Sequence, residues 1–475
     1  MSYKYNLTME LSMDAFFNPQ SIAIIGASNK PFNLGATICE YLTFLNYDAK
    51  IYAINRKGED VKGCKGYQSL QEIPHDLDLA IILTPAPTVP EVMEECGKKG
   101  IQAVIIETAG FTEEGEYGKQ LQKQVNEIAR QYNIRFIGPN CLGTLNAHNR
   151  FCCFFGARPG EYDGVFERPG DISYVIQSGG VGVLIMDSLR SDVVNVNKMM
   201  SIGNKEDIDE ADCIDYFNTD GTKVIGMYLE SIKNGTRFLN AAKRSSIPIL
   251  VYKVGRTNEG AKAAMSHTAG MANNDTIFDA ACRQVGIIRC KAISELHSMP
   301  KIFTTMPLLK GKRIAIFTNS GAFGGITSDL LVEAGFEIPT LSSELQQQIA
   351  RCGKLYNVSN PIDLGPTLSL QTFIDIFTNL LSSDEIDGIL AVPNVWQQVV
   401  IDGILELMKL CKHYDKPAGI YIPNAVDRIL KVRTAYSIPS FESPEEAVRA
   451  LQISYQYYCA SKKKSCIETK IAAGA

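Results

Sequence analysis

The sequence has no long hydrophobic run, and this absence restricts where the protein can act. A membrane-spanning helix needs about 20 consecutive apolar residues, and no stretch of this sequence approaches that length. The N-terminal segment also lacks the apolar core of a secretory signal. We therefore expect a cytoplasmic protein with no membrane partner.

The sequence also lacks an excess of basic residues. It has 47 Lys and Arg against 52 Asp and Glu, a net charge of -5, so no nucleic-acid partner is expected. None of the 13 cysteines forms a CxxC pair, and an odd number of scattered cysteines is typical of reduced thiols. We expect no metal site.

A regular alternation of short apolar runs and amphipathic segments is present instead. The first run covers residues 21–25, and strands are predicted near 50–54, 79–83, 102–106 and 134–137, with helices over 88–99 and 115–131. Strands alternating with helices predict a parallel, doubly wound α/β sheet. The runs are apolar throughout, as strands covered on both faces require.

The same opening recurs twice further along the chain. Residues 173–176 precede a glycine-rich loop at 177–182, and residues 313–317 precede another at 318–325. The three openings are one domain length apart, and Pro and Gly cluster between them. The sequence therefore predicts three domains, over residues 1–157, 158–306 and 307–475.

The loop over residues 26–35 is predicted to bind an anionic ligand. It follows a strand and precedes a helix, where backbone N–H groups attract phosphate. Ser28 stands where the second glycine of GxGxxG would be, and the second strand is followed by Asn55-Arg56-Lys57 rather than by an acidic residue. Basic groups there fit a phosphorylated ribose, as in CoA or NADP.

Two further loops could bind phosphate at the start of a helix. They are Ser178-Gly179-Gly180 and Ser320-Gly321-Ala322. A helix N-terminus carries a partial positive charge, so two such ends converging on one phosphoryl group could hold it without a metal. Glycine-rich loops also serve for tight strand–helix packing.

Among five histidines, His267 has distinctive surroundings. It lies in GAKAAMSHTAGMA (260–272), whose small residues allow close backbone approach or movement. A nucleophilic imidazole needs a partner that orients its other nitrogen, and Glu230, at the end of the apolar run 224–229, is the candidate. The alternative is a loop histidine bonded to backbone.

On these residues the chain resembles the α subunit of ADP-forming acetyl-CoA synthetases, relatives of succinyl-CoA synthetase. The resemblance covers about residues 15–460, and its most specific segment is KVGRTNEGAKAAMSHTAG (253–270). Other matching segments are GASNKPFNLG (26–35), TPAPTVP (84–90), ETAGF (107–111), GPNCLG (138–143), QSGGVG (177–182), SIGNKEDIDEAD (201–212), YLES (228–231), TNSGAFGG (318–325) and NPIDLG (360–365).

The resemblance implies a fold and a set of site residues. The fold is an N-terminal Rossmann-like CoA-binding domain followed by two flavodoxin-like doubly wound domains. His267 would be the phosphorylated nucleophile, Glu230 its charge partner, and Asn140 a neighbour of the thiol and the acyl phosphate. The two glycine-rich loops would hold the phosphoryl group. The residues near CoA would be Gly26, Ala27, Ser28, Asn29, Lys30, Asn55, Lys57, Pro85, Ala109 and Gly110.

The resemblance also implies a reaction and a partner. Acyl-CoA, phosphate and NDP would be converted reversibly to acid, CoA and NTP through an acyl phosphate and phosphohistidine. An ATP-grasp domain needs a long stretch that this sequence does not have to spare, so a separate β subunit would bind the Mg-nucleotide, in an α2β2 assembly. Small acids such as acetate are the family's usual substrates.

Three departures and three alternatives accompany this resemblance. SHTAG replaces the family's SHTGA, and FCCFFG (151–156) and PNVWQQ (393–398) are unusual. Phe151 to Phe155 and Trp396 hint at an apolar acyl pocket, although buried aromatics are more often core. The alternatives are a non-catalytic CoA-binding protein, an NADP-dependent oxidoreductase and a CoA or acyl transferase with a glutamyl intermediate.

Overall fold

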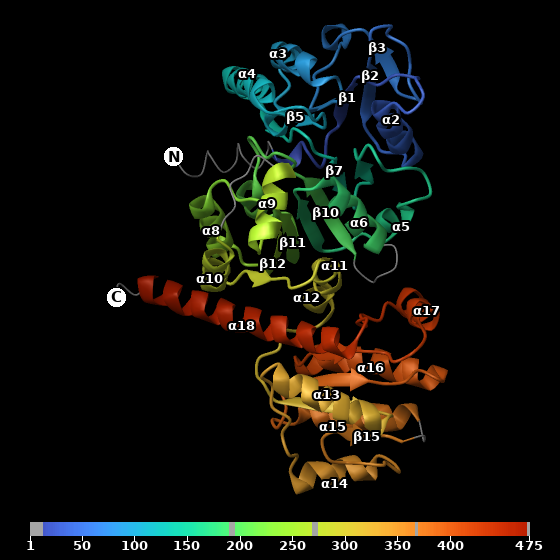
Figure 1. The fold of residues 1–475 in the computed structure, drawn as a ribbon. Helices are drawn as coiled ribbons and strands as arrows, with labels where there is room; N and C mark the ends of the chain where they lie inside the picture. Colours follow the sequence, from blue (N-terminus) through green and yellow to red (C-terminus); the bar gives the residue numbers. More distant parts are fainter. Residues whose placement is uncertain (1–12, 190–194, 268–273, 366–368, 473–475) are drawn as a thin grey trace. The chain divides into compact units, whose positions relative to one another are not determined.

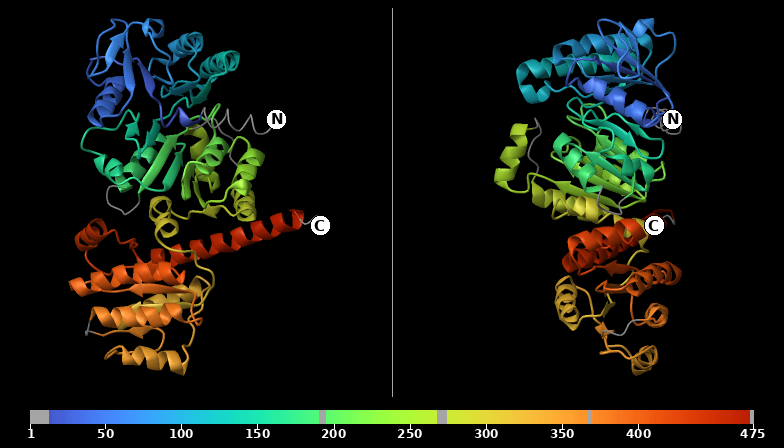
Figure 2. Two further views of the ribbon diagram at one scale, coloured as in Figure 1. Left: turned by 180° about the vertical axis from the view of Figure 1, so that it is seen from behind. Right: turned by 90° about the vertical axis from the view of Figure 1, so that its right-hand side faces the viewer.

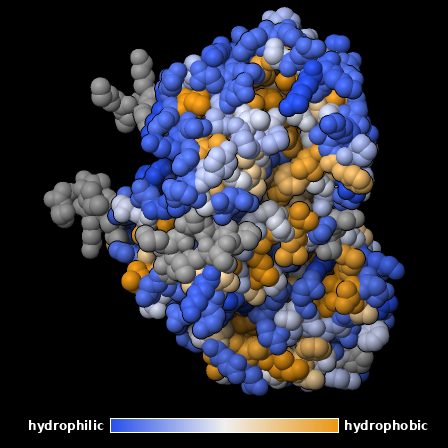
Figure 3. Space-filling view, turned by 45° about the horizontal axis from the view of Figure 1, so that its top comes forward, coloured by the Kyte–Doolittle hydropathy of each residue, from blue (hydrophilic) through white to orange (hydrophobic). Residues whose placement is uncertain are grey.

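The computed structural model describes residues 13–189, 195–267, 274–365 and 369–472. The chain divides into two compact units, the first ending at Leu296 and the second beginning at His297. The first unit contains two sheets and the second unit one (Figure 1). Among the described helices, none combines the length and the hydropathy that a bilayer crossing requires. On the face shown in Figure 3, hydrophobic residues are interspersed with hydrophilic ones.

The first sheet is a six-stranded parallel sheet of the order β3-β2-β1-β4-β5-β6. The predicted strands and helices of this region are confirmed. The strands are β1 (Ser21–Ile25), β2 (Lys50–Ile54), β3 (Lys65–Tyr67), β4 (Leu79–Ile82), β5 (Ala103–Ile106) and β6 (Arg135–Ile137), and the helices are α2 (Leu34–Phe44), α3 (Val89–Lys99) and α4 (Glu116–Tyr132).

Helices cover both faces of this sheet because alternate residues of each strand point in opposite directions. Ile22 and Ile24 of β1 pack in one apolar cluster with α2. Ala23 and Ile25 belong to another cluster, with α3 and α4. Figures 1 and 2 show α2 on one side of the sheet and α3 and α4 on the other. Burial on both faces explains why the strands are apolar throughout.

The second sheet has seven strands in the order β13-β12-β11-β9-β10-β7-β8. Its strands are β7 (Gly143–Asn146), β8 (Phe151–Cys152), β9 (Ile172–Ile176), β10 (Val196–Ser201), β11 (Val224–Leu229), β12 (Ile249–Lys253) and β13 (Ile288–Arg289). The helices of this part are α5 (Asp163–Glu167), α6 (Gly179–Leu189), α7 (Glu210–Phe217), α8 (Gly235–Arg244), α9 (Asn258–His267) and α10 (Asp275–Val285).

The hairpin of β7 and β8 was not foreseen. β7 runs antiparallel to β10, and β8 runs antiparallel to β7. These strands lie in the stretch assigned to the first predicted domain (1–157), but they extend the second sheet. The division into three domains at residues 157 and 306 stays a prediction.

The second unit has one parallel sheet of the order β15-β14-β16-β17. Its strands are β14 (Ile314–Thr318), β15 (Ile362–Asp363), β16 (Gly388–Val392) and β17 (Ala418–Ile420). Its helices are α12 (Lys301–Thr305), α13 (Gly321–Glu333), α14 (Ser343–Arg351), α15 (Leu370–Ser382), α16 (Gln398–Tyr414), α17 (Val426–Tyr436) and α18 (Pro444–Ala472), preceded by α11 (Glu295–Ser298) at the junction.

Candidate functional site

The loop between β1 and α2 is held in one conformation by the side chain of Asn33. Its Oδ1 accepts hydrogen bonds from the N–H groups of Ser28 (2.9 Å) and Ala36 (2.8 Å), and its Nδ2 donates to the carbonyl of Gly26 (3.0 Å). Gly35 packs closely on Ala27, because a Cβ added to Gly35 would lie only 2.8 Å from the Cα of Ala27. The predicted residues Gly26, Ala27 and Ser28 therefore form a closed turn at the start of a helix, a geometry suited to phosphate.

The turn after β2 borders this loop. Asn29 Nδ2 donates to the carbonyl of Asp60 (2.9 Å), which ties the two segments together. Asn55 Oδ1 accepts from the N–H groups of Lys57 (3.2 Å) and Glu59 (3.1 Å). The side chain of Asn55 thus shapes its own turn, and the exposed Lys57 ammonium forms an ion pair with Glu59 at 3.2 Å. Lys30 is exposed as well.

The predicted segments after β4 and β5 lie against each other. Thr108 Oγ1 donates to the carbonyl of Thr84 at 2.7 Å, immediately before Pro85. Gly110, which follows Ala109, has φ +107, and a Cβ on it would lie 3.0 Å from Cβ of Ala86. β2, β1, β4 and β5 are neighbours in the parallel sheet. All the predicted CoA-binding segments therefore lie at the edge formed by the carboxyl ends of the strands, around the point where the strand order reverses. Ligands of open α/β sheets bind at this position.

Glu113 was missed by the sequence reasoning, and it links the CoA segments to Asn140. Its Oε1 accepts from the N–H of Gly110 (2.7 Å), and its Oε2 accepts from Asn204 Nδ2 (2.5 Å). Burial opposes ionisation, but hydrogen bonds from Gly110, its own N–H, Asn204 and Phe111 hold the pKa of Glu113 below its ordinary value. The sequence feature that could have indicated this residue is a carboxylate three residues after Gly110, close enough to accept its N–H.

Asn140 lies where the edges of the two sheets in the first unit meet. It has φ 60 in the loop after β6, and its N–H donates to the carbonyl of Thr108 at 3.0 Å. Asn204, in the loop after β10, donates its N–H to the carbonyl of Pro139 (2.9 Å) and accepts at Oδ1 from Asn140 Nδ2 (3.5 Å). The loop at 138–143 is therefore shared by both sheets.

A buried carboxyl group lies beneath this shared loop. Glu107 follows β5, is 6% exposed, and has no hydrogen-bond partner at either oxygen among the described residues. A Cβ on Gly143 would lie 2.8 Å from Oε1 of Glu107 and 2.6 Å from Sγ of Cys153. Burial raises the pKa of Glu107 well above its ordinary value. The structure thus favours the neutral acid at this position.

Glu230 is anchored beside the glycine-rich loop after β9. The N–H groups of Glu230 (2.8 Å) and Ser231 (3.2 Å) both donate to Oε1 of Gln177. Gln177 directly precedes Ser178, and α6 begins at Gly179. Glu230 is 9% exposed. Because β9 and β11 are adjacent, Glu230 and the Ser178-Gly179-Gly180 loop lie at the same edge. Their roles toward a phosphoryl group stay predictions.

A buried ion pair that the sequence did not predict holds the backbone next to Glu230. Lys205 is fully buried; its Nζ lies 2.8 Å from Oε2 of Glu210 and donates to the carbonyl of Ser231. A buried ammonium paired with both a carboxylate and a carbonyl fixes the chain that follows Glu230. The segment 201–212 matches the family, but its sequence alone does not predict this buried ion pair.

His267 is the last residue of α9, which follows β12, the neighbour of β11. Its side chain, and residues 268–273, lie outside the described part of the structure, so its predicted approach to Glu230 stays a prediction. In the second unit, α13 begins at Gly321 after Ser320, and Ala322 is exposed. The joint action of this helix end with Ser178 also stays a prediction.

The aromatic residues that hinted at an acyl pocket differ in their surroundings. Phe151 is fully buried, with its ring centroid 5.1 Å from that of Tyr47, and Phe154 and Cys153 are buried beside it. These residues form core. Trp396 is 68% exposed.

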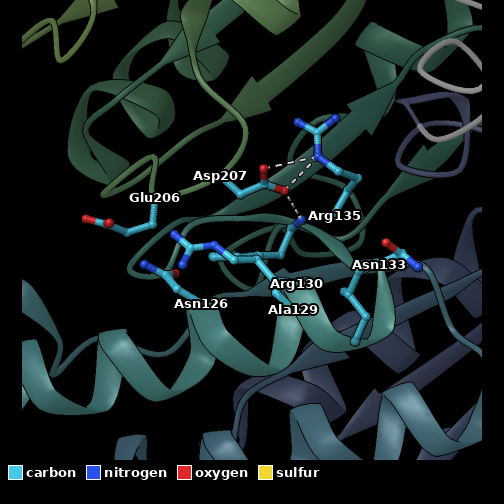
Figure 4. Close-up of a pocket in the computed structure, with 9 residues that line it drawn as sticks. Asn126, Ala129, Arg130, Asn133, Arg135, Glu206 and Asp207 are labelled. Atoms are coloured by element: carbon cyan, nitrogen blue, oxygen red, sulfur yellow. Dashed lines mark hydrogen bonds and ion pairs between the residues drawn. The ribbon is translucent and has the colours of Figure 1, made fainter. Parts of the chain in front are cut away.

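A pocket of about 340 Å³ lies in the first unit between α4, β6 and the loop after β10 (Figure 4). Arg135 Nε donates to Asp207 Oδ2 at 2.8 Å, and the same oxygen accepts the N–H of Phe136 at 2.8 Å. These contacts brace the shared loop. The pocket is lined by Asn126, Ala129, Arg130, Asn133, Ile134, Arg135, Phe136, Glu206 and Asp207, and contains none of the predicted site residues.

Two protein families match the sequence over parts that correspond to the two sheets of the first unit. A family of CoA binding domains matches residues 20–147. A family of succinyl-CoA ligase like flavodoxin domains matches residues 169–303.

Individual relatives match nearly the whole chain. The α subunit of ADP-forming acetate–CoA ligase I from Pyrococcus furiosus is 33% identical, over 94% of this chain and 98% of that subunit. The ADP-forming acetate–CoA ligase II of Archaeoglobus fulgidus is 35% identical, over 94% of this chain and 67% of its own length. The structure of dinucleotide-forming acetyl-coenzyme A synthetase 1 from Ca. Korarchaeum cryptofilum, solved with phosphate and ADP, superposes with a TM-score of 0.85 at 28% identity, covering 95% of this chain and 97% of that one.

A mostly parallel α/β fold with a CoA-binding sheet edge, joined to a succinyl-CoA ligase-like sheet, defines an acyl-CoA synthetase of the NDP-forming class. The chain belongs to the family of ADP-forming acetate–CoA ligases, in which it corresponds to the α subunit. The resemblance, the fold class and the CoA-binding function expected from the sequence are thereby confirmed.

Proposed function

We propose that this chain is the catalytic α subunit of an ADP-forming acyl-CoA synthetase that acts through phosphorylated His267. The supporting observation is that the edge with the CoA segments and the edge with Glu230 and Ser178 meet at one loop. Asn140 and Asn204 join them. A thioester bound at the first edge would have its acyl end directed toward the second.

The proposed chemistry has two steps on this chain. An oxygen of phosphate attacks the thioester carbonyl, forming a C–O bond and breaking the C–S bond, so that the CoA thiolate leaves and takes up a proton. A ring nitrogen of neutral His267 then attacks phosphorus, breaking the P–O bond to the carboxylate. Glu230 would stabilise the imidazole as it gains positive charge, and the N–H groups at Ser178-Gly179-Gly180 would stabilise the phosphoryl oxygens.

The second half of the reaction is proposed to take place on a partner. Relatives named as α subunits imply a partner subunit. We propose an ATP-grasp β subunit that holds the Mg-nucleotide, an α2β2 assembly, and action in the cytoplasm. The proposed acyl preference, small acids such as acetate, is taken from relatives named as acetate–CoA ligases.

The experiment is incubation of the chain with acetyl-CoA and radiolabelled phosphate. The expected product is an acid-labile, base-stable label on wild-type protein that is lost in His267→Ala. His75→Ala, a change at an exposed loop histidine, serves as the control and should label normally. Label that persists in His267→Ala would refute the assigned nucleophile.

Glu230→Gln distinguishes the charge partner from a merely structural residue. Glutamine keeps the volume and the backbone anchors to Gln177, so the variant should fold and bind CoA. We expect labelling to slow by about 100-fold or more, the scale of removing one preorganised electrostatic contact. An unchanged rate would assign the role to another group.

The partner is tested by adding a candidate β subunit and ADP to labelled protein. Transfer of label to ATP, together with a mass equal to two copies of each chain, is the expected result. A stable complex with a different ratio would correct the stoichiometry, and no transfer would refute the nucleotide half-reaction.

A further inference from the structure

Phe32 combines two features that a loop residue rarely has together. Its side chain is 98% exposed, and its backbone has φ 61, a left-handed conformation that bulky residues seldom adopt. Water contact with a whole phenyl ring and a strained backbone are both unfavourable for the folded chain. Such residues concentrate at functional sites, where a ligand makes use of them.

The exposure of Phe32 is not the result of a loosely held loop. The next residue, Asn33, makes three hydrogen bonds that close the loop on Gly26, Ser28 and Ala36. The packing of Gly35 on Ala27 fixes the start of α2. The ring is thus presented from a rigid support.

The position of the loop indicates which part of a ligand it borders. In sheets of this type, a diphosphate lies at the start of the first helix, and the attached ribose lies near the end of the second strand. Asn29 connects the loop to Asp60 beyond β2, and Asn55 and Lys57 follow β2 directly. By this geometry, the adenosine half of CoA would lie on the side of β1 where these segments meet.

We propose that Phe32 stacks on the adenine ring of bound CoA. Every base has a π face that an aromatic side chain can cover, and covering it would remove the phenyl ring from water. The exposed Lys57 ammonium follows β2, beside the position expected for the ribose, and its charge suits the ribose phosphate. The inference rests on the CoA-binding edge described above and adds a residue to which no comparison gives a role.

The test is calorimetric titration of the full chain with CoA and with its two halves, adenosine bisphosphate and phosphopantetheine. Phe32→Ala should lower the affinity for CoA and for adenosine bisphosphate by about 5-fold to 150-fold, the range expected for base–aromatic stacking. Phosphopantetheine affinity should remain unchanged. Tyr117→Ala, which removes another exposed aromatic ring (61%) of the same sheet's helices, should leave all three affinities unchanged.

Two further variants separate stacking from backbone effects. Phe32→Gly relieves the left-handed strain, so its melting temperature should rise while its CoA affinity falls. Phe32→Tyr retains an aromatic face and should bind CoA as the wild type does. This combination of higher stability with weaker binding is not expected of a residue that only shapes the loop.

The outcomes that overturn the inference are specific. The inference would be refuted if the Phe32→Ala variant bound CoA and adenosine bisphosphate with affinities within twofold of those of the wild type. Equal weakening of phosphopantetheine would mean that the loop has been distorted, and loss of β-subunit association with unchanged CoA affinity would mean that the ring contacts the partner. If the wild-type chain binds CoA but Phe32 variants are unaffected, the proposed function stands and only this inference fails. If wild type binds none of the three ligands, the CoA assignment fails as well.

Discussion

Replacing Glu107 by glutamine should change how stability depends on pH. Burial raises the pKa of Glu107 well above 4.5, its ordinary value. Between pH 4.5 and the folded-state pKa, the folded chain keeps a proton that the unfolded chain releases. The unfolded state therefore binds fewer protons, and the free energy of unfolding falls as pH rises.

The expected magnitude follows from this proton count. One proton retained in the folded state lowers the free energy of unfolding by about 1.4 kcal/mol for each pH unit in that interval. Glutamine has nearly the same shape and does not titrate, so Glu107→Gln lacks this contribution. The stability of the variant relative to wild type should therefore increase with pH by that slope. All other titrating groups are common to both proteins and cancel in the difference.

The assay must report on the first unit. Trp396, the only tryptophan, lies in the second unit, so its fluorescence serves as an internal control. Unfolding of the first unit can be followed in urea by the labelling of its buried thiols, among them Cys153 beside Glu107. Midpoints measured at several pH values between 5 and 8 give the two slopes.

A matched control is Glu127→Gln, a change at an exposed carboxylate of α4, which should leave the pH slope unaltered. Parallel slopes for wild type and Glu107→Gln would refute the reasoning. That result would mean that Glu107 is ionised in the folded protein.

Three further predictions concern residues that support the site. Lys205→Met should lower the free energy of unfolding by roughly 3–5 kcal/mol, because it leaves Glu210 buried without its partner, and adding Glu210→Leu should recover most of the loss in urea titrations. Asn33→Ala removes a helix cap and should cost about 1–2 kcal/mol in the same assay while weakening CoA binding; an unchanged CoA affinity would contradict the role of this turn. Gly143→Ala places a methyl group against Cys153 and Glu107 at φ +101, so little folded protein should be recovered, and a normal melting temperature would show that the loop can shift.

Much of this fold follows from the sequence pattern. The apolar run Ser21–Ile25 became β1, with alternate residues in two separate clusters, and the predicted loops do follow strands. Parallel strands bring such loops to one edge by geometry alone. For this reason, placing Gly26, Asn55, Pro85 and Gly110 together required only the strand order.

What the sequence could not predict depends on contacts between distant residues. Nothing local marks Glu107 as a buried acid, because Gly143 and Cys153, which lie close to it, come much later in the sequence. The pairing of Lys205 with the carbonyl of Ser231 joins segments 26 residues apart. The segment FCCFF reads as either pocket or core from the sequence, and the structure places Phe151 to Phe154 in the core.

The β7–β8 hairpin restricts how the protein can be divided. A fragment ending at residue 157 would carry this hairpin without β10, its partner in the second sheet. The exposed edge of β7 would then present unpaired N–H and C=O groups, a template for strand pairing between molecules. Such a fragment should self-associate, whereas one that continues through Leu296 keeps the hairpin paired. A fragment designed to carry the CoA-binding sheet should therefore also include the strands of the second sheet that pair with this hairpin.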